Sequence, residues 1–422
     1  MKIGVAKKCI NPTGFSVHLS GFANPKRQYT GVWNDTWVRA MVLQDDNTTL
    51  ALVGCDLLHV NSTRLQAIGP KILKKTGIPL DNILFNACHT HSMPAVAENN
   101  RILDDYDAEY IDFLYEQVVS ALCEAYENLE EGALEYAFAP FPGYAINRRR
   151  IVDGKCEFYP NPDGIIRENA LILRAVCNGQ TKGILTKFTC HASTIGENTA
   201  HGDWPGYACN CMEEQNPGAV ALYMQGCCGD LRPCVVENPD DLYHTDFREG
   251  RYEDVANMGS AFARLAQKTM AGEMTPVTGG LSVKKLHFML PLQPQPPMSA
   301  YDDVPGENYQ LTIFKAFMRK NYDTYPTESP SSLQRIDLGD KLTIIGIEGE
   351  PVVEYEYHMD RIFPDRDVVT LGYSNGAMNY IPVERMFAEG GYESLESAPY
   401  YFTLPWDTSV ERRIVGMAEK LK

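Results

Sequence analysis

The chain has 422 residues, of which 44% are hydrophobic and 22% charged, a composition typical of a soluble globular protein with a substantial core. Its formal net charge of −17 disfavours nucleic acid and anionic membranes as partners, since both bind basic patches. No apolar run approaches the roughly 18 residues of a membrane span. The 12 cysteines are too few for a disulfide scaffold and the first residues carry no apolar leader, so we expect free thiols and a cytoplasmic protein.

Short apolar runs and helical segments recur along the chain and indicate its secondary structure. The runs are nearly continuous and do not alternate with polar residues, which favours strands covered on both faces. We expect strands at 49–58, 82–89, 182–191, 219–226, 341–349 and 367–375. Apolar residues recur at helical spacing in 109–129 and 254–270, which predicts helices there. The sequence therefore predicts an α/β fold of mixed β-sheets covered by helices, with the active site at converging strand ends.

Two stretches lack this regularity. Residues 235–253 are charged without periodicity, and residues 288–310 are rich in proline. We interpret both as long loops that line a cleft. Because no internal repeat is visible and the segment after residue 400 is short, we expect a single domain over residues 1–422.

Polar side chains follow the predicted strands where these end. In chain order they are Asp56, His89, His91, His191, Asp230, Glu350 and Tyr380. In α/β folds, ligands gather at strand ends, and imidazole nitrogen and carboxylate oxygen are good ligands for zinc. On an extended strand, side chains two residues apart point to one face, so His89 and His91 are expected to face the same site. Either both bind a metal, or one binds it while the other transfers protons.

At these same positions the chain resembles a known family. The segment NACHTHSMP (86–94) is similar to the His-Thr-His-Ser-Gly-Pro signature of the neutral/alkaline non-lysosomal ceramidases. Further similar motifs follow in the family's order: SGFANP (20–25), WVRAMVL (37–43), CDLLHV (55–60), INRRR (146–150), HASTIGENTAHGDWPGYA (191–208), EGEPVVEY (348–355) and YSNGAMNYIPVERMFAEGGYES (373–394).

The resemblance implies a zinc-dependent amidase and a role for each matching residue. It implies zinc bound by His89, His191, Glu350 and Tyr380. It makes His91 the general acid and base, and places Arg148 and Tyr392, together with the Tyr380 hydroxyl, at the substrate or its oxyanion. Two alternatives stay open: His91 completes the zinc shell, or Arg148 belongs to a surface basic run with Arg149 and Arg150.

Departures from the family pattern concern the substrate. In GDLRPC (229–234) Arg232 replaces the family's serine, and Met93 replaces the glycine of the signature. We also expect neither a C-terminal immunoglobulin-like domain nor a membrane-docking segment. We therefore expect a small polar N-acyl compound rather than ceramide, contacted by Asp230, Arg232 and Met93.

Other interpretations of the sequence differ in reaction or in class. If the protein uses the same metal for another reaction, it is an esterase or a true ceramidase. If it does not catalyse a reaction, it is a ligand-binding protein with the same fold. A thiol nucleophile at Cys88 or Cys190 is disfavoured, because strand alternation turns each thiol away from the adjacent histidine. The expected partner is a small-molecule substrate, with neither nucleic acid nor a stable membrane association, and a homo-oligomer is left open.

Overall fold

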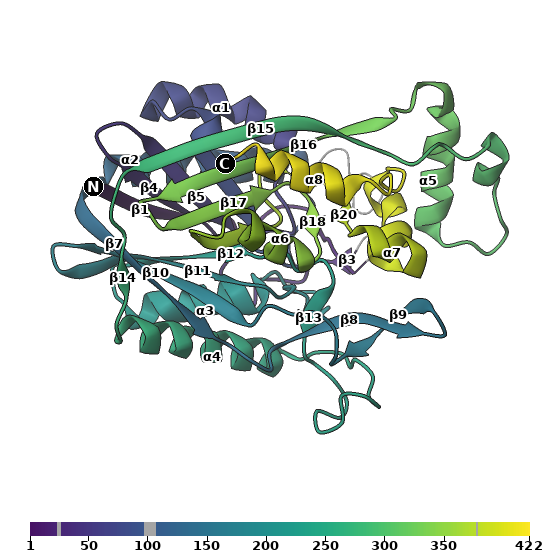
Figure 1. Ribbon diagram of the computed structural model, residues 1–422, viewed down its shortest axis with the longest axis horizontal. Coiled ribbons are helices and arrows are strands. Elements are labelled where there is room, and N and C mark those ends of the chain that lie inside the picture. The colour runs from purple at the N-terminus through teal and green to yellow at the C-terminus, as the bar shows by residue number, and fades with distance from the viewer. Residues whose placement is uncertain (23–26, 97–106, 377–378) are drawn as a thin grey trace.

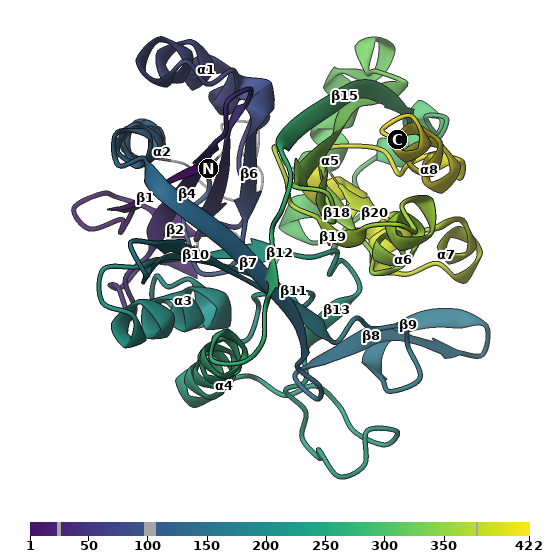
Figure 2. The same ribbon diagram turned by 60° about the vertical axis from the view of Figure 1, so that its left-hand side comes forward.

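Two β-sheets packed face to face form the centre of the protein, with helices on their outer faces (Figure 1, Figure 2). The computed structural model describes residues 1–22, 27–96, 107–376 and 379–422. The larger sheet has the strand order β12-β11-β10-β7-β1-β4-β5-β6 with β14 beside β7, and the smaller sheet has the order β15-β16-β17-β19. Parallel and antiparallel pairs occur in both, so the expected α/β fold with mixed sheets is confirmed.

The bounds of the elements are as follows. Strands of the larger sheet are β1 (Lys2–Cys9), β4 (Trp37–Gln44), β5 (Thr49–Cys55), β6 (Ile83–Ala87), β7 (Glu130–Pro140), β10 (Asn169–Cys177), β11 (Gln180–Phe188), β12 (Val220–Gln225) and β14 (Thr275–Pro276). Those of the smaller sheet are β15 (Leu281–Pro291), β16 (Glu328–Leu338), β17 (Leu342–Ile347) and β19 (Asp367–Leu371). Short sheets pair β13 (Leu231–Pro233) with β8 (Ala145–Val152) and β9 (Lys155–Asn161), β18 (Glu350–Pro351) with β20 (Tyr380–Ile381), and β2 (His18–Leu19) with β3 (Arg27–Gln28). The helices are α1 (Ser62–Thr76), α2 (Ala108–Glu127), α3 (Asp203–Gln215), α4 (Tyr252–Met270), α5 (Tyr309–Lys320), α6 (Glu354–Ile362), α7 (Glu384–Glu389) and α8 (Val410–Glu419).

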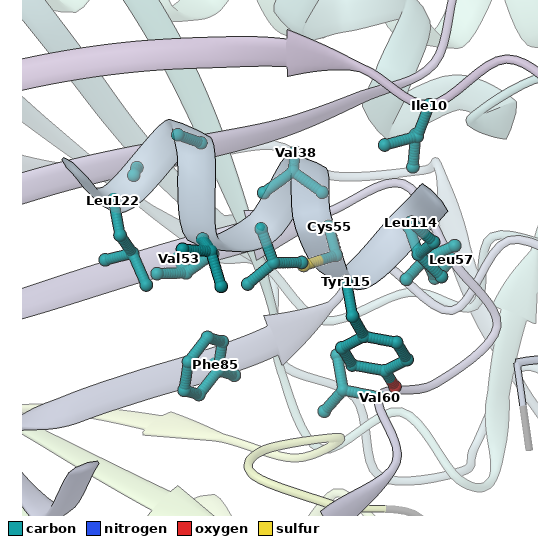
Figure 3. Close-up of a cluster of buried hydrophobic side chains, with 14 of the residues drawn as sticks. Ile10, Val38, Val53, Cys55, Leu57, Val60, Phe85, Leu114, Tyr115 and Leu122 are labelled. Atoms are coloured by element: carbon teal, nitrogen blue, oxygen red, sulfur yellow. The ribbon is translucent and has the colours of Figure 1, made fainter. Parts of the chain in front are cut away.

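The central strands are apolar on both faces because each face has its own cover. In β5, Leu50 and Leu52 face the smaller sheet, while Ala51 and Val53 face α1 and α2. Figure 3 shows the latter cluster, in which side chains of α2 lie against strand residues such as Val53 and Phe85. On their outer faces β10–β12 are covered by α3 and α4, and the smaller sheet by α6 and α8. This double burial explains why the apolar runs in the sequence do not alternate.

The predicted strands and helices are all present, but the strand predictions run too far at their C-terminal ends. The runs expected at 82–89, 182–191 and 367–375 pair only as far as Ala87, Phe188 and Leu371. Beyond those points the backbone leaves the sheet and enters the loops that carry the polar residues. The residues past the last ladder pairs are Cys-His, Thr-Cys-His and Gly-Tyr-Ser-Asn, and composition alone does not mark the residue at which pairing stops.

The two stretches expected to be loops differ from each other. Residues 288–291 belong to β15, and farther along Tyr301 packs on Phe314 of α5. The 235–253 stretch is a loop up to the start of α4, and its Phe247 reaches the guanidinium of Arg232. None of the helices in the described ranges combines the length and apolar character that a membrane crossing requires.

Candidate metal and substrate site

Three histidines from different strand ends form a buried cluster. The ring centroids of His89 and His191 lie 4.7 Å apart, and His91 lies 4.9 Å from His89 and 5.4 Å from His191. Their ligand nitrogens all lie within 4.8 Å of one another. The convergence of the strand ends after β6 and β11 is therefore as expected from the sequence.

The expected reason for the pairing of His89 with His91 is wrong. His89 follows the end of β6 and adopts a left-handed backbone, φ 65°, so the segment is a turn and not an extended strand. Histidine is among the residues that tolerate this conformation. The two rings meet because the chain reverses at His89, after which the backbone N–H of His91 donates to the carbonyl of Ala192 at 3.2 Å.

His89 and His191 present the same ring nitrogen to the site. Nδ1 of His89 donates to the carbonyl of Leu58 at 2.6 Å, and Nδ1 of His191 donates to the carbonyl of Cys228 at 2.8 Å. These bonds place the hydrogen on Nδ1 and leave the Nε2 lone pair of each ring free for a metal. Burial, and then the neighbouring positive charge, holds the pKa of His191 well below its usual value, which keeps it in the neutral form that binds metals.

Glu350 and Tyr380 complete this set from β18 and β20, whose short parallel ladder places the two residues opposite each other. Glu350 Oε2 lies 3.2 Å from His89 Nε2 and 4.0 Å from His191 Nε2. The Tyr380 hydroxyl lies 3.5 Å from His191 Nε2. His89 Nε2 and Glu350 Oε2 are buried, and neither has a hydrogen-bond partner in the described part of the chain.

This arrangement fits a zinc ion. With the His89 hydrogen on Nδ1, the two facing atoms at 3.2 Å need a positive charge between them, either a proton on Nε2 or a metal cation. Two imidazole nitrogens, a carboxylate oxygen and a phenol oxygen form a donor set that zinc accepts. Burial alone would raise the pKa of Glu350, but His89 and the Tyr401 hydroxyl, which donates to Glu350 Oε1, hold it below the usual value.

His91 differs from the other two histidines in its hydrogen-bond partner. Its Nδ1 accepts the backbone N–H of Phe22 at 3.2 Å, which assigns the ring hydrogen to Nε2. A nitrogen that bears a hydrogen has no lone pair for a metal, so Nε2 of His91 differs in this state from Nε2 of His89 and His191. Gly21, with φ 97°, is required beside this ring, because a Cβ there would lie 2.6 Å from the Cβ of His91.

A pair of buried amides holds the strand ends together, and the sequence gave no expectation for them. Gln225 donates from its side chain to the carbonyls of Cys88 and Cys190 at 2.8 and 2.9 Å, the residues directly before His89 and His191. Asn86 in turn accepts the Gln225 backbone N–H at 2.6 Å. The sequence feature that could have indicated them is one amide side chain inside each of two otherwise apolar runs, LFNAC and YMQGC.

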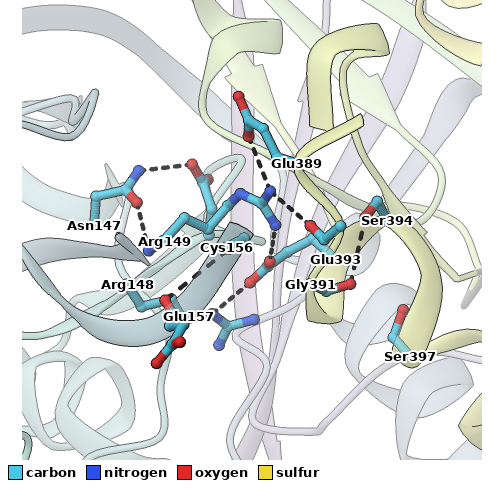
Figure 4. A network of polar contacts seen from close by, with 12 residues as sticks. Asn147, Arg148, Arg149, Cys156, Glu157, Glu389, Gly391, Glu393, Ser394 and Ser397 are labelled. Carbon is cyan, nitrogen blue, oxygen red and sulfur yellow. Dashed lines mark hydrogen bonds and ion pairs between the residues drawn. The ribbon is translucent and has the colours of Figure 1, made fainter. Parts of the chain in front are cut away.

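Arg148 is buried in the site and does not belong to a surface run. Its side chain is 7% exposed and donates from Nε to Glu393 at 2.8 Å, while Arg149 donates to the other oxygen of Glu393 at 2.6 Å (Figure 4). The register of β8 shifts between Asn147 and Arg149, and both adjacent arginines reach the same carboxylate. Nη2 of Arg148 is buried without a hydrogen-bond partner in the described residues.

Tyrosines surround this arginine and the metal ligands. The Arg148 guanidinium carbon lies 5.5 Å from the Tyr380 ring centroid and 5.7 Å from that of Tyr392. Tyr392 and Glu393 share a single π-helical turn, a feature that often occurs at functional sites. Tyr401, bonded to Glu350, and Tyr373, with its ring centroid 4.2 Å from that of His89, are additional site residues that the sequence analysis missed.

Two expected substrate contacts have structural roles instead. Both carboxylate oxygens of Asp230 are used within the protein, one by the Asn147 amide at 2.8 Å and the other by the backbone N–H of Val353 at 2.9 Å. The side chain of Met93 is fully buried in the apolar cluster beneath α2. Asp56, another strand-end residue, pairs with buried Arg39 at 2.8 Å. Residues at strand ends also make structural contacts at the edge of the core. Their polarity alone therefore does not distinguish a structural role from contact with a ligand.

The thiols next to the metal histidines are not arranged as nucleophiles. Burial raises the pKa of Cys88 and of Cys190 well above the usual thiol value, which keeps both protonated. The Sγ atoms point to backbone carbonyls, that of Cys88 to Gly202 at 3.8 Å and that of Cys190 to Tyr144 at 3.9 Å.

Comparison with known proteins agrees with this geometry. Residues 1–288 match the family model described as neutral/alkaline non-lysosomal ceramidase, N-terminal. A neutral ceramidase of Pseudomonas aeruginosa is 24% identical over 296 residues, a match that covers 65% of this chain and 43% of that protein, less than two thirds of its length. The crystal structure of a neutral ceramidase from Pseudomonas aeruginosa has a TM-score of 0.78 at 18% identity, covering 100% of this chain and 74% of the other. A ceramidase complexed with C2 gives the same TM-score and identity, covering 100% and 75%.

Proposed function

The chain belongs to the neutral/alkaline non-lysosomal ceramidase family, and on this premise we propose that it is a zinc-dependent hydrolase that cleaves the C–N bond of an amide. The observation that carries the proposal is the facing pair of buried atoms, His89 Nε2 and Glu350 Oε2, which lie 3.2 Å apart and have no hydrogen-bond partner in the described residues. His89, His191, Glu350 and Tyr380 would hold the metal. A zinc ion supplies the Lewis acidity that makes water nucleophilic near neutral pH.

Side chains around the proposed metal ligands supply proton transfer, stabilisation of the oxyanion and orientation of the amide. To act as general base, His91 would need the Nε2 lone pair, which is free when the ring hydrogen moves to Nδ1; it would then take the proton of the attacking water and give that proton to the leaving amine nitrogen, with no net gain or loss of protons. The unpaired Nη2 of Arg148 donates to the oxygen on which negative charge develops. The phenols of Tyr380 and Tyr392 border the same space and orient the amide.

We further propose that the substrate is a small polar N-acyl compound rather than ceramide. Arg148 and Arg232 place two guanidinium groups on this side of the site, and Glu393 pairs with Arg148. An uncharged lipid amide would cover the charge of Arg232 without compensating it, which is unfavourable. A polar substrate compensates that charge on binding.

Hydrolysis by the metal-stripped and the zinc-restored protein tests the reaction. The substrates are an N-acyl amine of a small polar compound, the matching O-acyl ester, and a ceramide, and the readout is the amine or alcohol released. We expect amide cleavage that disappears on chelation and returns with zinc. Ester cleavage without amide cleavage would make the protein an esterase. Ceramide cleavage without cleavage of the polar amide would refute the proposed substrate class. No turnover of any substrate would favour a binding protein.

A variant that removes only the proton-transfer group serves as control. His91→Gln keeps an amide in place of the imidazole but cannot exchange a proton near neutral pH. It is expected to bind zinc with the affinity of the native protein and to lose about 10²- to 10⁴-fold in kcat, the range typical of a general acid or base.

A further inference from the structure

Arg232 stands out because its charge has no carboxylate partner among the residues that the structure describes. It lies on β13 opposite Ile146 of β8, and its Nε is buried without a hydrogen-bond partner in the described residues. No carboxylate of the described chain lies within ion-pair distance of it. Three buried arginines do have a carboxylate partner: Arg39 pairs with Asp56 at 2.8 Å, and Arg148 and Arg149 share Glu393.

The position of Arg232 places its charge at the catalytic side chains. Arg148 and Arg232 lie against the same aromatic ring, that of Phe158, with guanidinium carbons 5.3 and 5.6 Å from its centroid. Burial and Arg148 lower the pKa of Arg232 itself to about 10, so the guanidinium remains charged at neutral pH.

Two phenylalanines fix the plane of this guanidinium. Its carbon lies 4.3 Å from the ring centroid of Phe247 and 5.6 Å from that of Phe158, and the two rings are 5.6 Å apart. Stacking on aromatic faces leaves the N–H groups in the guanidinium plane free for a planar acceptor. Arg232 is only partly buried and the neighbouring Phe158 is 50% exposed, so solvent reaches this part of the protein.

We propose that Arg232 forms the binding subsite for a carboxylate of the substrate, which makes N-acyl amino acids the substrate class. The proposal rests on the proposed amide hydrolysis and adds the group that the protein recognises. A carboxylate matches the fork of the guanidinium with two parallel hydrogen bonds. It also carries the single negative charge that compensates one unpaired cation, whereas a phosphate dianion would leave excess negative charge in a chain whose net charge is already −17.

Paired substrates that differ only in this charge test the subsite. N-acyl glycines, from acetyl to dodecanoyl, are compared with the corresponding glycinamides in the native protein and in Arg232→Gln and Arg232→Lys. We expect the native protein to prefer the carboxylate by about 10- to 100-fold in kcat/KM, the range of a charged hydrogen bond. That ratio should fall close to one in Arg232→Gln, mainly through KM, and be partly retained in Arg232→Lys.

The control variant is Arg319→Gln on α5, which removes the same charge from a surface ion pair with Asp302. It should leave the carboxylate preference unchanged. A native protein without preference, or a preference that persists in Arg232→Gln, overturns the subsite.

Direct binding separates the subsite from the reaction. If the zinc-loaded native protein cleaves none of these amides, the proposed function fails, and calorimetric titration with uncleaved N-acetylglycine and N-acetylglycinamide then decides the subsite. Tighter binding of the carboxylate that is lost in Arg232→Gln supports it, and equal binding of the two compounds refutes it.

Discussion

On the side of the site proposed for the metal, His89 and His191 are oriented by backbone carbonyls, those of Leu58 and Cys228, whereas on the side proposed for the substrate Arg148 is oriented by a side-chain carboxylate, that of Glu393. Backbone carbonyls stay in place as long as the strands do, so the metal side depends on the fold itself. The substrate side depends on one carboxylate 245 positions away along the chain. The comparison teaches that single substitutions should disturb the charge pattern of the site more readily than the orientation of its metal ligands.

The largest effect on stability is expected from Glu393→Gln. Glu393 serves two buried guanidinium groups, and a neutral amide would leave both charges uncompensated. We expect the free energy of unfolding, measured by urea denaturation at fixed pH, to fall by about 3–5 kcal/mol, as when a buried ion pair loses one partner.

Glu389→Gln is the matched control for that change. Glu389 also pairs with Arg149, at 3.1 Å, but its side chain is 21% exposed and water can replace part of the interaction. A loss of less than about 1 kcal/mol is expected. Equal losses in the two variants would mean that Glu393 is not the element that fixes the substrate side.

A smaller effect, on both stability and metal binding, is expected from Gln225→Leu. The change removes the two N–H groups that bind the carbonyls of Cys88 and Cys190 and leaves those carbonyls buried without donors. Unfolding free energy should fall by about 2 kcal/mol, and zinc affinity by about 10-fold because the ligand-bearing segments lose a shared support.

Gln334→Leu distinguishes a specific loss of zinc affinity from a general loss of stability. Gln334 is also fully buried and donates to the carbonyl of Asp81 at 2.8 Å, at the start of β6 rather than its end. It should lower stability to a similar degree while zinc affinity, measured by competition with a chelator, stays at the native value. An equal loss of zinc affinity in both variants would show that Gln225 acts only through general stability.

The smallest effect is expected from Met93→Leu. Met93 lies in the apolar cluster and not against the substrate, and a swap that conserves volume changes stability by less than about 1.5 kcal/mol. The kcat/KM ratio between any two substrates should be the same as in the native protein. A changed ratio would return Met93 to the substrate pocket expected from the sequence.

Much of the fold could be predicted because burial on both faces leaves an unambiguous mark. The strands β5, β6 and β17 are covered by a second sheet on one side and by helices on the other, so their apolar residues do not alternate with polar ones. The convergence of strand ends likewise placed His89 and His191 together. Their geometry was beyond the sequence, because the left-handed turn at His89 depends on contacts with other segments.

The site residues that escaped prediction act through partners distant in sequence. Glu393, Tyr401 and Gln225 matter because of what they bind, and nothing local distinguishes them from other polar residues. Asp230 and Met93 are the opposite case: they occupy positions typical of a functional site, but their side chains stabilise the protein interior. Residue type at a strand end therefore predicts where a site lies better than which side chains belong to it.

The most direct test of this account is the metal content of three purified proteins at equal concentration: native, His191→Ala and His91→Ala. The hydrogen-bond partners leave a lone pair on Nε2 of His191 and a hydrogen on Nε2 of His91, and under the proposed function the first is a ligand and the second transfers protons. We expect about one zinc per chain in the native protein and in His91→Ala, and loss of the metal in His191→Ala. A native protein that takes up no zinc, or equal loss in the two variants, would contradict the assignment of roles.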